Sequence, residues 1–193
     1  AVRRFRFDAP LAGAMASPTL PGWILSAGEG EVLYEDRPLP LGTMAIRGSA
    51  RPVGDSYRVE DVEIRSGSLG RLTGQVAFHG GNVSGRLNGE RLPVDNLANL
   101  AGALGGHDWK GWSPTGAIDV AARLDPVEGG RRVAATATFG QIGFRSPNGD
   151  AMGQHLGGTV DLDAHLTTRP RVNVDLALRR GEALWGTVYL DLA

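Results

Sequence analysis

The sequence predicts an all-β protein folded as one long antiparallel meander, in which each strand pairs with the next one along the chain. Three observations support this fold class. Apolar and polar residues alternate in most segments, as in half-buried strands. The 29 glycines stand mainly at the starts of these segments and in the turns between them. Only residues 95–104 show the apolar spacing of a convincing helix.

The clearest pattern is a hairpin at the start of the stretch 69–124. Apolar residues or glycine occupy every second position from Leu72 to Phe78. A two-residue turn at Gly80 and Gly81 sets a register that puts the apolar residues of both strands on one face. In this register Phe78 faces Val83, Val76 faces Gly85 and Gly74 faces Leu87.

A short helix is predicted after this hairpin. Residues 95–104 carry leucines at helical spacing, Asp95 can cap the first turn, and Gly105 ends the helix. The chain then returns through a loop to a strand at residues 116–124. We therefore expect one amphipathic helix inserted between antiparallel strands and lying against one end or face of the sheet.

The other strands follow the same alternation. Residues 56–65 change phase between Val59 and Val62, which predicts a β-bulge near Glu60 and Asp61. Strand openings at Gly74, Gly116 and Gly158 are spaced 42 residues apart, a repetition that a long meander produces. The other predicted strands span residues 2–8, 23–27, 31–35, 43–50, 132–139 with a bent extension at 141–145, 158–166, 171–180 and 184–192, and residues 37–40 are expected to be a turn.

The composition excludes several classes of function. Lys and Arg number 20 against 21 Asp and Glu, and neither sign forms a long run, so the chain lacks the basic footprint of a nucleic-acid-binding protein. The absence of cysteine excludes disulfides and thiolate metal sites. No apolar run approaches the ~20 residues needed to span a bilayer, and no cleavable signal segment is visible.

A sheet with one apolar face must cover that face. The single predicted helix is too short to cover about a dozen strands, which leaves a sandwich, a closed barrel, or a sheet with a groove that an apolar ligand fills. Small inward residues such as Ala122 and Ala135 would make room for a ligand or let two sheet layers approach closely. These alternatives stay open at the level of sequence.

Several phrases resemble the AsmA-like superfamily of Gram-negative envelope proteins, which includes the TamB and YhdP types and the type II secretion N-component. They are LTGQVAF at residues 72–78, the hairpin that follows, LPVDNLANL at 92–100 and PTGAIDV at 114–120. The likeness runs roughly from residue 58 to the end. It implies a strongly curved, taco-like sheet with an apolar groove for phospholipid acyl chains, in the periplasm. We interpret residues 1–193 as a single β-rich domain of a longer protein, anchored to the inner membrane by a segment absent from this chain.

The candidate binding residues belong to two groups. Tryptophans 109 and 112 flank Lys110 in a loop, where they would contact a membrane interface or a sugar, or close the end of the sheet. Trp185 and Tyr189 share one face of the last predicted strand and would pack against a partner. The interface candidates are thus Trp109, Trp112, Trp185 and Tyr189, and the ligand-binding candidates on the apolar face are Leu72, Val76, Phe78, Leu87, Ile118, Val120, Val160, Leu162, Val174 and Leu176.

No catalytic, cofactor or metal site is predicted. Asp161, Asp163 and His165 alternate along one strand, a spacing that would suit a divalent metal but is expected of any solvated strand face. Phosphate-loop, dinucleotide and zinc-protease motifs are missing. Carboxylates such as Glu182 and Asp191 are interpreted as surface charges rather than a glycosidase pair.

We therefore predict a non-enzymatic periplasmic domain for envelope assembly or lipid handling, which binds apolar chains in a groove of its sheet. One alternative keeps the fold and makes the chain a protein-binding component of a type II secretion system or another envelope machine. A second is a carbohydrate-binding or hydrolytic β-domain that uses Trp109, Trp112 and outward carboxylates. The expected partners are phospholipid acyl chains or envelope and secretion proteins, without nucleic acid or a cofactor.

Overall fold

The computed structural model describes residues 5–8, 20–27, 31–34, 37–40, 43–54, 56–79, 82–105 and 111–192. These residues form thirteen strands and one helix, α1 (Val94–Gly105). The strands are β1 (Phe5–Asp8), β2 (Leu20–Ala27), β3 (Glu31–Tyr34), β4 (Arg37–Pro40), β5 (Met44–Val53), β6 (Ser56–Ser66), β7 (Gly70–His79), β8 (Asn82–Pro93), β9 (Ala117–Val127), β10 (Gly130–Arg145), β11 (Ala151–Leu166), β12 (Arg171–Trp185) and β13 (Val188–Asp191).

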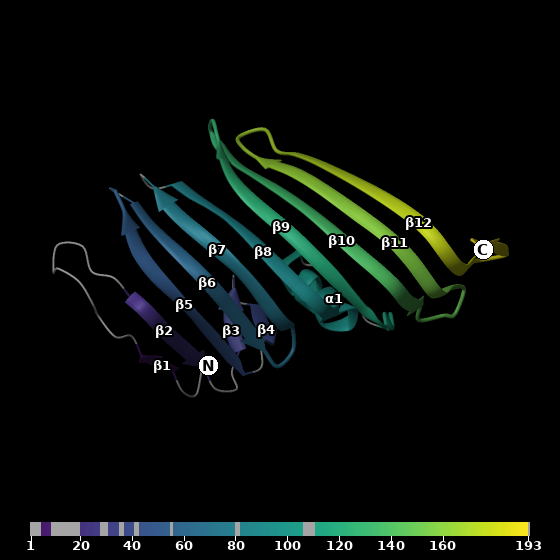
Figure 1. Cartoon of the computed structure of the whole chain (residues 1–193). Coiled ribbons are helices and arrows are strands. Elements are labelled where there is room, and N and C mark those ends of the chain that lie inside the picture. Colours follow the sequence, from purple (N-terminus) through teal and green to yellow (C-terminus); the bar gives the residue numbers. More distant parts are fainter. Residues whose placement is uncertain are drawn as a thin grey trace.

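Eleven of the strands form one antiparallel sheet, which confirms the predicted meander. Their order in the sheet is β1, β2, β5 to β13, so that each strand pairs with the next strand of this sheet along the chain. The small β3–β4 sheet lies between β2 and β5 in the chain, and α1 lies between β8 and β9. Figure 1 shows the sheet twisting and curving from the N-terminal to the C-terminal end. The sheet is not closed into a barrel, because in the described part of the chain β1 and β13 lie at opposite ends of the strand order.

The registers predicted from the alternation are confirmed in the middle of the sheet. The shift between Val59 and Val62 marks the predicted bulge in β6, where Asp61 adopts a positive φ of 51°. The β10 strand also continues past Gly140, with register shifts against β11 as expected for a bent extension. In the β7–β8 hairpin the facing pairs are Phe78–Val83, Val76–Gly85 and Gly74–Leu87, as predicted.

The structure differs from the sequence-based prediction in β4, which was expected to be a turn, and in β11, which begins earlier than expected. Residues Arg37–Pro40 were expected to turn the chain, but they form β4, which pairs with β3 alone. Proline is tolerated there because a strand of a two-stranded sheet needs donors on one side only. Strand β11 begins at Ala151 rather than near Gly158, and a bulge around His155, with φ 53°, breaks the alternation that would have revealed the earlier part.

The predicted last strand over residues 184–192 is wrong. Gly186 has a φ of 58° and lies in a turn between the end of β12 and the start of β13, which folds back antiparallel on β12. Tyr189 pairs with Leu184 and shares its face, whereas Trp185, the next residue along β12, points to the other face. The two aromatic residues that were expected on one face therefore lie on opposite faces.

The helix α1 lies at the end of the strands where the chain passes from β8 to β9 (Figure 1). It contacts β4 and β8. The Val94 backbone N–H donates to the Gly116 carbonyl over 3.1 Å, and the Asn96 side chain donates to the Ser68 carbonyl. These bonds hold the first turn of the helix against the neighbouring β6–β7 turn and the start of β9.

The large sheet is mostly a single layer. Within the described residues only α1 and the β3–β4 sheet are available as a second layer. The buried apolar side chains of the described residues are accordingly few: Val62, Leu92, Ala151, Leu156 and Ala164. The described helix is also too short to cross a membrane.

Candidate binding surface

One face of the large sheet is built from cross-strand rows that contain only apolar residues and glycine. Because neighbouring strands lie about 4.8 Å apart, a row that crosses nine strands is about 38 Å long. The longest row is Leu25, Ile46, Ile64, Leu72, Gly89, Val120, Ala137, Val160 and Leu176. Beside it run Val62, Gly74, Leu87, Ala122, Ala135, Leu162 and Val174, and then Val59, Val76, Gly85, Leu124, Val133, Ala164 and Val172.

All ten predicted ligand-binding residues lie on this apolar face. Eight of them are members of the three rows. Phe78 extends the face at one end, opposite Val83, and Ile118 extends it at the other, opposite Phe139. The candidate set included no residue of β2 or β5, although the alternation over residues 43–50 already indicated that Met44 and Ile46 face inward.

The apolar face is open to solvent toward the C-terminal end of the sheet. The side chains of Val174 and Leu176 on β12 are 60% and 59% exposed, whereas Ala164 on β11 is buried. Phe78 is also exposed, at the far end of β7. Contiguous exposed apolar surface of this kind marks a site of interaction rather than a finished core.

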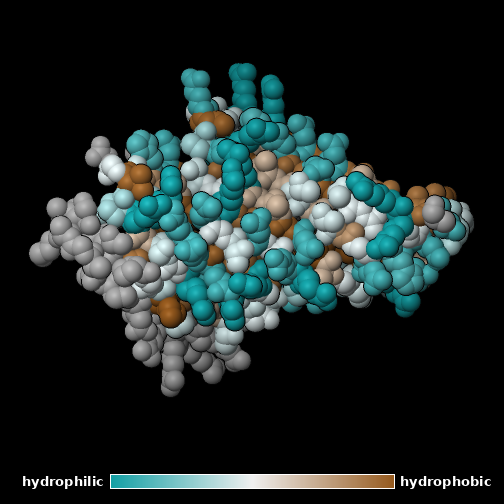
Figure 2. Space-filling view, in the orientation of Figure 1, coloured by the Kyte–Doolittle hydropathy of each residue, from teal (hydrophilic) through white to brown (hydrophobic). Residues whose placement is uncertain are grey.

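The opposite face of the sheet is polar. Figure 2 shows it crowded with hydrophilic side chains, with hydrophobic residues mostly at the margins. Its hollows lie between long side chains, and the one of about 400 Å³ has Arg86 and Arg123 on one side and Asp161 and Asp175 on the other. The polar face therefore presents arginine and carboxylate side chains to the solvent.

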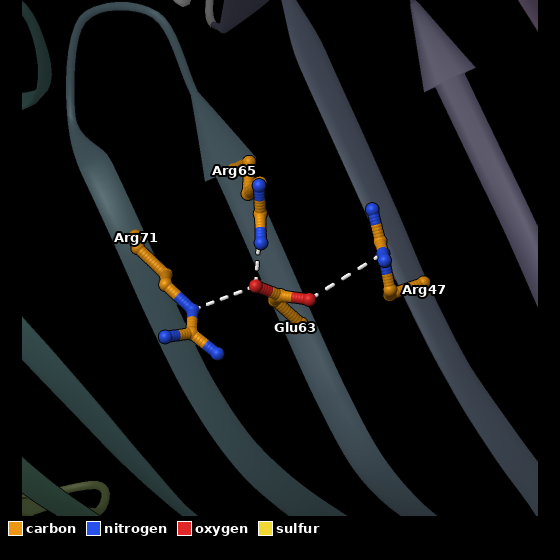
Figure 3. Close-up of polar contacts among 4 residues, drawn as sticks. All are labelled: Arg47, Glu63, Arg65 and Arg71. Atoms are coloured by element: carbon orange, nitrogen blue, oxygen red, sulfur yellow. Dashed lines mark hydrogen bonds and ion pairs between the residues drawn. The ribbon is translucent and has the colours of Figure 1, made fainter.

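Glu63 is the centre of the best-developed ion cluster on the polar face. Its side chain is only 12% exposed and lies among three arginines from three strands (Figure 3). The distances from its carboxylate are 2.8 Å to Arg65 Nε, 2.6 Å to Arg71 Nε and 3.4 Å to Arg47 Nε. Hydrogen bonding from Arg65, then from Arg71, lowers the pKa of Glu63 below its ordinary value of 4.5, while burial opposes the shift.

Replacing Glu63 by Gln should weaken the fold and flatten its response to acid. A carboxyl whose pKa is lowered in the folded state stabilises the fold above its unfolded pKa, and this contribution disappears as the pH falls through the folded pKa. The melting temperature of the wild type should therefore fall on acidification below about pH 4.5 more steeply than that of Glu63→Gln. Thermal melts by circular dichroism from pH 7 to pH 3 measure both slopes.

Glu128→Gln, in the exposed turn between β9 and β10, is the matched control for this measurement. It removes the same charge without disturbing a cluster, so its melting curve should follow that of the wild type at each pH. Equal slopes for Glu63→Gln and Glu128→Gln would contradict a stabilising role for the cluster.

The residues considered for a metal site are held by other protein groups. Arg132 donates to both oxygens of Asp163 at 2.8 Å and lowers the pKa of that carboxyl, and Thr136 donates to Asp161 at 2.6 Å. His165 Nε2 lies 3.6 Å from Asp163. In the described ranges no three metal-ligating side chains gather at one point.

The aromatic candidates have different surroundings. Trp112 is half-buried with its ring centroid 6.1 Å from that of Phe144, so it closes the end of the sheet near β10, while Trp109 lies outside the described residues. Trp185 and Tyr189 are exposed. Partial desolvation by neighbouring atoms, together with the nearby Glu182 carboxylate, raises the pKa of Tyr189 above its ordinary value. Glu182 and Asp191 face each other across β12 and β13.

Comparison with family models, curated proteins and solved structures finds no match to this chain. The function of the surface is therefore inferred from its own side chains. The apolar face presents exposed apolar side chains. On the polar face, the carboxylates of Glu60, Glu63 and Asp163 are held by arginines as structural ion pairs.

Proposed function

We propose that this chain is a non-enzymatic domain that holds apolar chains, such as the acyl chains of phospholipids, against the apolar face of its open sheet. The observation that carries the proposal is the set of three adjacent cross-strand rows without a polar side chain, on a sheet that is mostly one layer thick. In a dry sandwich a second sheet would cover such rows.

The dimensions of the face suit a lipid. The longest row spans about 38 Å, against about 30 Å for the hydrocarbon core of a whole bilayer, so an acyl chain from one leaflet fits along part of it. Burying a CH₂ group fully gives about 0.8 kcal/mol, and a chain covered on one side gains roughly half of that per group.

The resemblance to AsmA-like proteins supports a location for this activity. We propose that the domain works in the periplasm of a Gram-negative cell, as part of a longer protein anchored to the inner membrane. There it would handle lipid or take part in envelope assembly. The apolar face would keep acyl chains away from water between membranes.

Lipid that co-purifies with the chain tests the proposal. The protein is expressed in the periplasm of a Gram-negative host, purified without harsh detergent, extracted and analysed by mass spectrometry. The double variant Phe78→Gln and Leu166→Gln places amides at two positions of the apolar face that are 46% and 50% exposed. Its content of phospholipid should fall several-fold below that of the wild type.

The matched control carries the same change on the polar face. Ile24 and Val53 lie there and are 46% and 42% exposed, so Ile24→Gln with Val53→Gln removes similar apolar area without touching the rows. The control should keep the lipid content of the wild type. If the wild type carries no more lipid than an unrelated periplasmic protein prepared in parallel, direct lipid binding is excluded.

A protein-binding role is the second candidate, and the exposed aromatic side chains of Trp185 and Tyr189 favour it. Tyrosine and tryptophan are enriched at protein interfaces, and exposed apolar patches mark sites of interaction. Cross-linking in cells tests this role. Capture of a defined envelope protein, together with purified chain that carries no lipid, would support protein binding over lipid binding.

A further inference from the structure

Arg86 of β8 lies on the polar face without a carboxylate partner. The arginines of β5, β6 and β7 all lie within 3.9 Å of a carboxylate oxygen, in ion pairs with Glu60 or Glu63. Arg86, in contrast, forms no ion pair with a described residue. It lies in the middle of the sheet, where β7 and β9 pair with β8 on its two sides. The positions around it are therefore filled by residues that the structure describes.

The strand registers show which residues surround Arg86. Gln75 of β7 lies directly opposite on one side, and Arg123 of β9 lies directly opposite on the other. Ser84 and Asn88 are the next residues of β8 on the same face, because side chains alternate along a strand. Amides, a hydroxyl and a second cation thus surround Arg86. The side chains of Gln75, Ser84 and Asn88 form no hydrogen bond with any group in the described part of the chain.

Arg86 and Arg123 are a facing pair of like charges. Side chains in such a pair have Cβ atoms about 4.5–5.5 Å apart, and like charges there destabilise a sheet. The Asp125 carboxylate accepts the Nε–H of Arg123 over 2.8 Å, while the Nη groups of Arg123 donate to no residue that the structure describes. An anion bound between the two guanidinium groups would accept hydrogen bonds from both and remove their repulsion.

The two guanidinium groups line a hollow of about 320 Å³ on the polar face, together with the side chains of Gln75 and Ser84. Arg58 lines the same hollow from β6. It lies 3.9 Å from Glu60, too far for a hydrogen bond, and Arg51 already donates to both oxygens of that carboxylate, at 2.8 and 3.0 Å. The charged lining residues of the hollow are three arginines and one aspartate, which leaves an excess of two positive charges.

We propose that this hollow binds a phosphate group, with Arg86 as the central ligand. A phosphate monoester carries close to two negative charges at neutral pH and has three strong acceptor oxygens. Its charge matches the excess of the hollow, and its oxygens can accept from two guanidinium groups and from the neutral donors of Gln75 and Ser84 together. A carboxylate, with two oxygens and one charge, would leave part of the positive charge and some of the donors without a partner.

A lipid held on the apolar face cannot supply this phosphate. The hollow lies on the opposite face of the sheet, and further described strands flank it on both sides, so a headgroup cannot reach it around a sheet edge. The remaining sources are inorganic phosphate, a soluble phosphate ester and the headgroups of a membrane that the polar face approaches. Phosphate binding therefore goes beyond the proposed function and can hold or fail separately from it.

Isothermal titration calorimetry of the purified chain with glycerol phosphate and with inorganic phosphate tests the hollow, with sodium chloride at equal ionic strength as the blank. The wild type should bind both probes. Arg86→Glu turns the facing pair with Arg123 into opposite charges, so it should weaken binding more than about tenfold and leave the melting temperature unchanged or higher. Arg179→Glu makes the same change of charge on β12, outside the hollow, and should bind like the wild type. No binding by the wild type, or equal binding by Arg86→Glu, overturns the proposal.

Gln75→Ala separates a built site from diffuse attraction to arginines, because it leaves the net charge unchanged. It should weaken binding of glycerol phosphate several-fold through the loss of the amide donor. Gln141→Ala is the matched control, since Gln141 is an exposed residue of β10 outside the hollow, and it should change nothing. Equal affinities of these two variants would mean that charge alone attracts the phosphate, which overturns a site built around Arg86.

Vesicles distinguish the sources of the phosphate. Flotation is measured for the wild type and Arg86→Glu with phosphatidylcholine vesicles, with and without phosphatidic acid, whose headgroup is a phosphate monoester. Flotation that requires both phosphatidic acid and Arg86 assigns the hollow to lipid headgroups, and calorimetric binding of glycerol phosphate without such flotation assigns it to a soluble ester. Either result supports the phosphate site. Protein that carries no co-purified lipid would exclude the lipid binding proposed for the apolar face and leave these measurements unchanged.

Discussion

Replacing Leu92 by Ala should lower the free energy of unfolding by about 2–5 kcal/mol, the range for removing a large buried aliphatic side chain. Leu92 is 3% exposed and lies at the end of β8, just before α1. It fills the space over Gly89, where an added Cβ atom would lie 2.6 Å from the Leu92 side chain and 2.7 Å from that of Leu72. Truncation leaves a cavity that these neighbours cannot fill without moving strands.

The single-layer character of the sheet makes this a sharp test. Few described side chains are as buried as Leu92, so each of them carries a large share of the packing. Leu166→Ala is the matched control, since Leu166 lies on the same face of the sheet but is 50% exposed. Urea denaturation followed by circular dichroism should show a much smaller loss for this control. Equal losses in the two variants would contradict the view that buried Leu92 contributes more to stability than an exposed leucine of the same face.

The alternation of apolar residues was sufficient to predict most of the sheet. It determines which face each strand buries, and placing the apolar residues of β7 and β8 on one face sets the register of this hairpin. The β6 bulge was predictable for the same reason, because two residues, Glu60 and Asp61, break an otherwise regular phase. The hairpin register and the bulge depend on residues that are close in the sequence, so the local pattern is enough to predict them.

Features that join distant segments could not be predicted in this way. The carboxylate of Glu63 contacts arginines of β5, β6 and β7. Which arginines of β5 and β7 lie beside it depends on the registers of the β5–β6 and β6–β7 pairs. The turn at Gly186 has the glycine that it requires, but the alternation of apolar residues continues through it and favoured an unbroken strand.

The structure explains why glycine occupies positions 74, 116 and 158, which are spaced 42 residues apart. An added Cβ atom at Gly74 would lie 2.1 Å from the Arg86 carbonyl oxygen, and one at Gly158 would lie 2.1 Å from the Ala177 carbonyl oxygen. Gly116 has a φ of 101°, and a Cβ atom there would lie 2.4 Å from the Gln141 carbonyl oxygen. Each glycine thus permits a close approach of the next strand, as the pairing of a curved sheet requires.

Gly74→Ala should therefore destabilise the protein by about 3 kcal/mol, at the upper end for overpacking, although alanine is normally the better residue in a strand. The clash is with backbone in the middle of the sheet, so β7 and β8 must separate to relieve it. Gly22→Ala is the control with the opposite expected sign. A Cβ atom at Gly22 meets nothing within 4 Å, and the substitution should be neutral or stabilise the fold by up to about 1 kcal/mol through the unfolded chain.

Gly158→Ala tests whether the loss of stability depends on how freely the neighbouring strand can move. Its Cβ atom would lie as close to a carbonyl oxygen, that of Ala177, but among the described strands only the short β13 lies beyond β12. In this chain β12 can therefore move outward, and the loss should be smaller than for Gly74→Ala. Chemical denaturation of the three variants should give the order Gly74→Ala, Gly158→Ala, Gly22→Ala from least to most stable. A Gly74→Ala variant as stable as the wild type would mean that the strands are not held as closely as the curvature of this sheet demands.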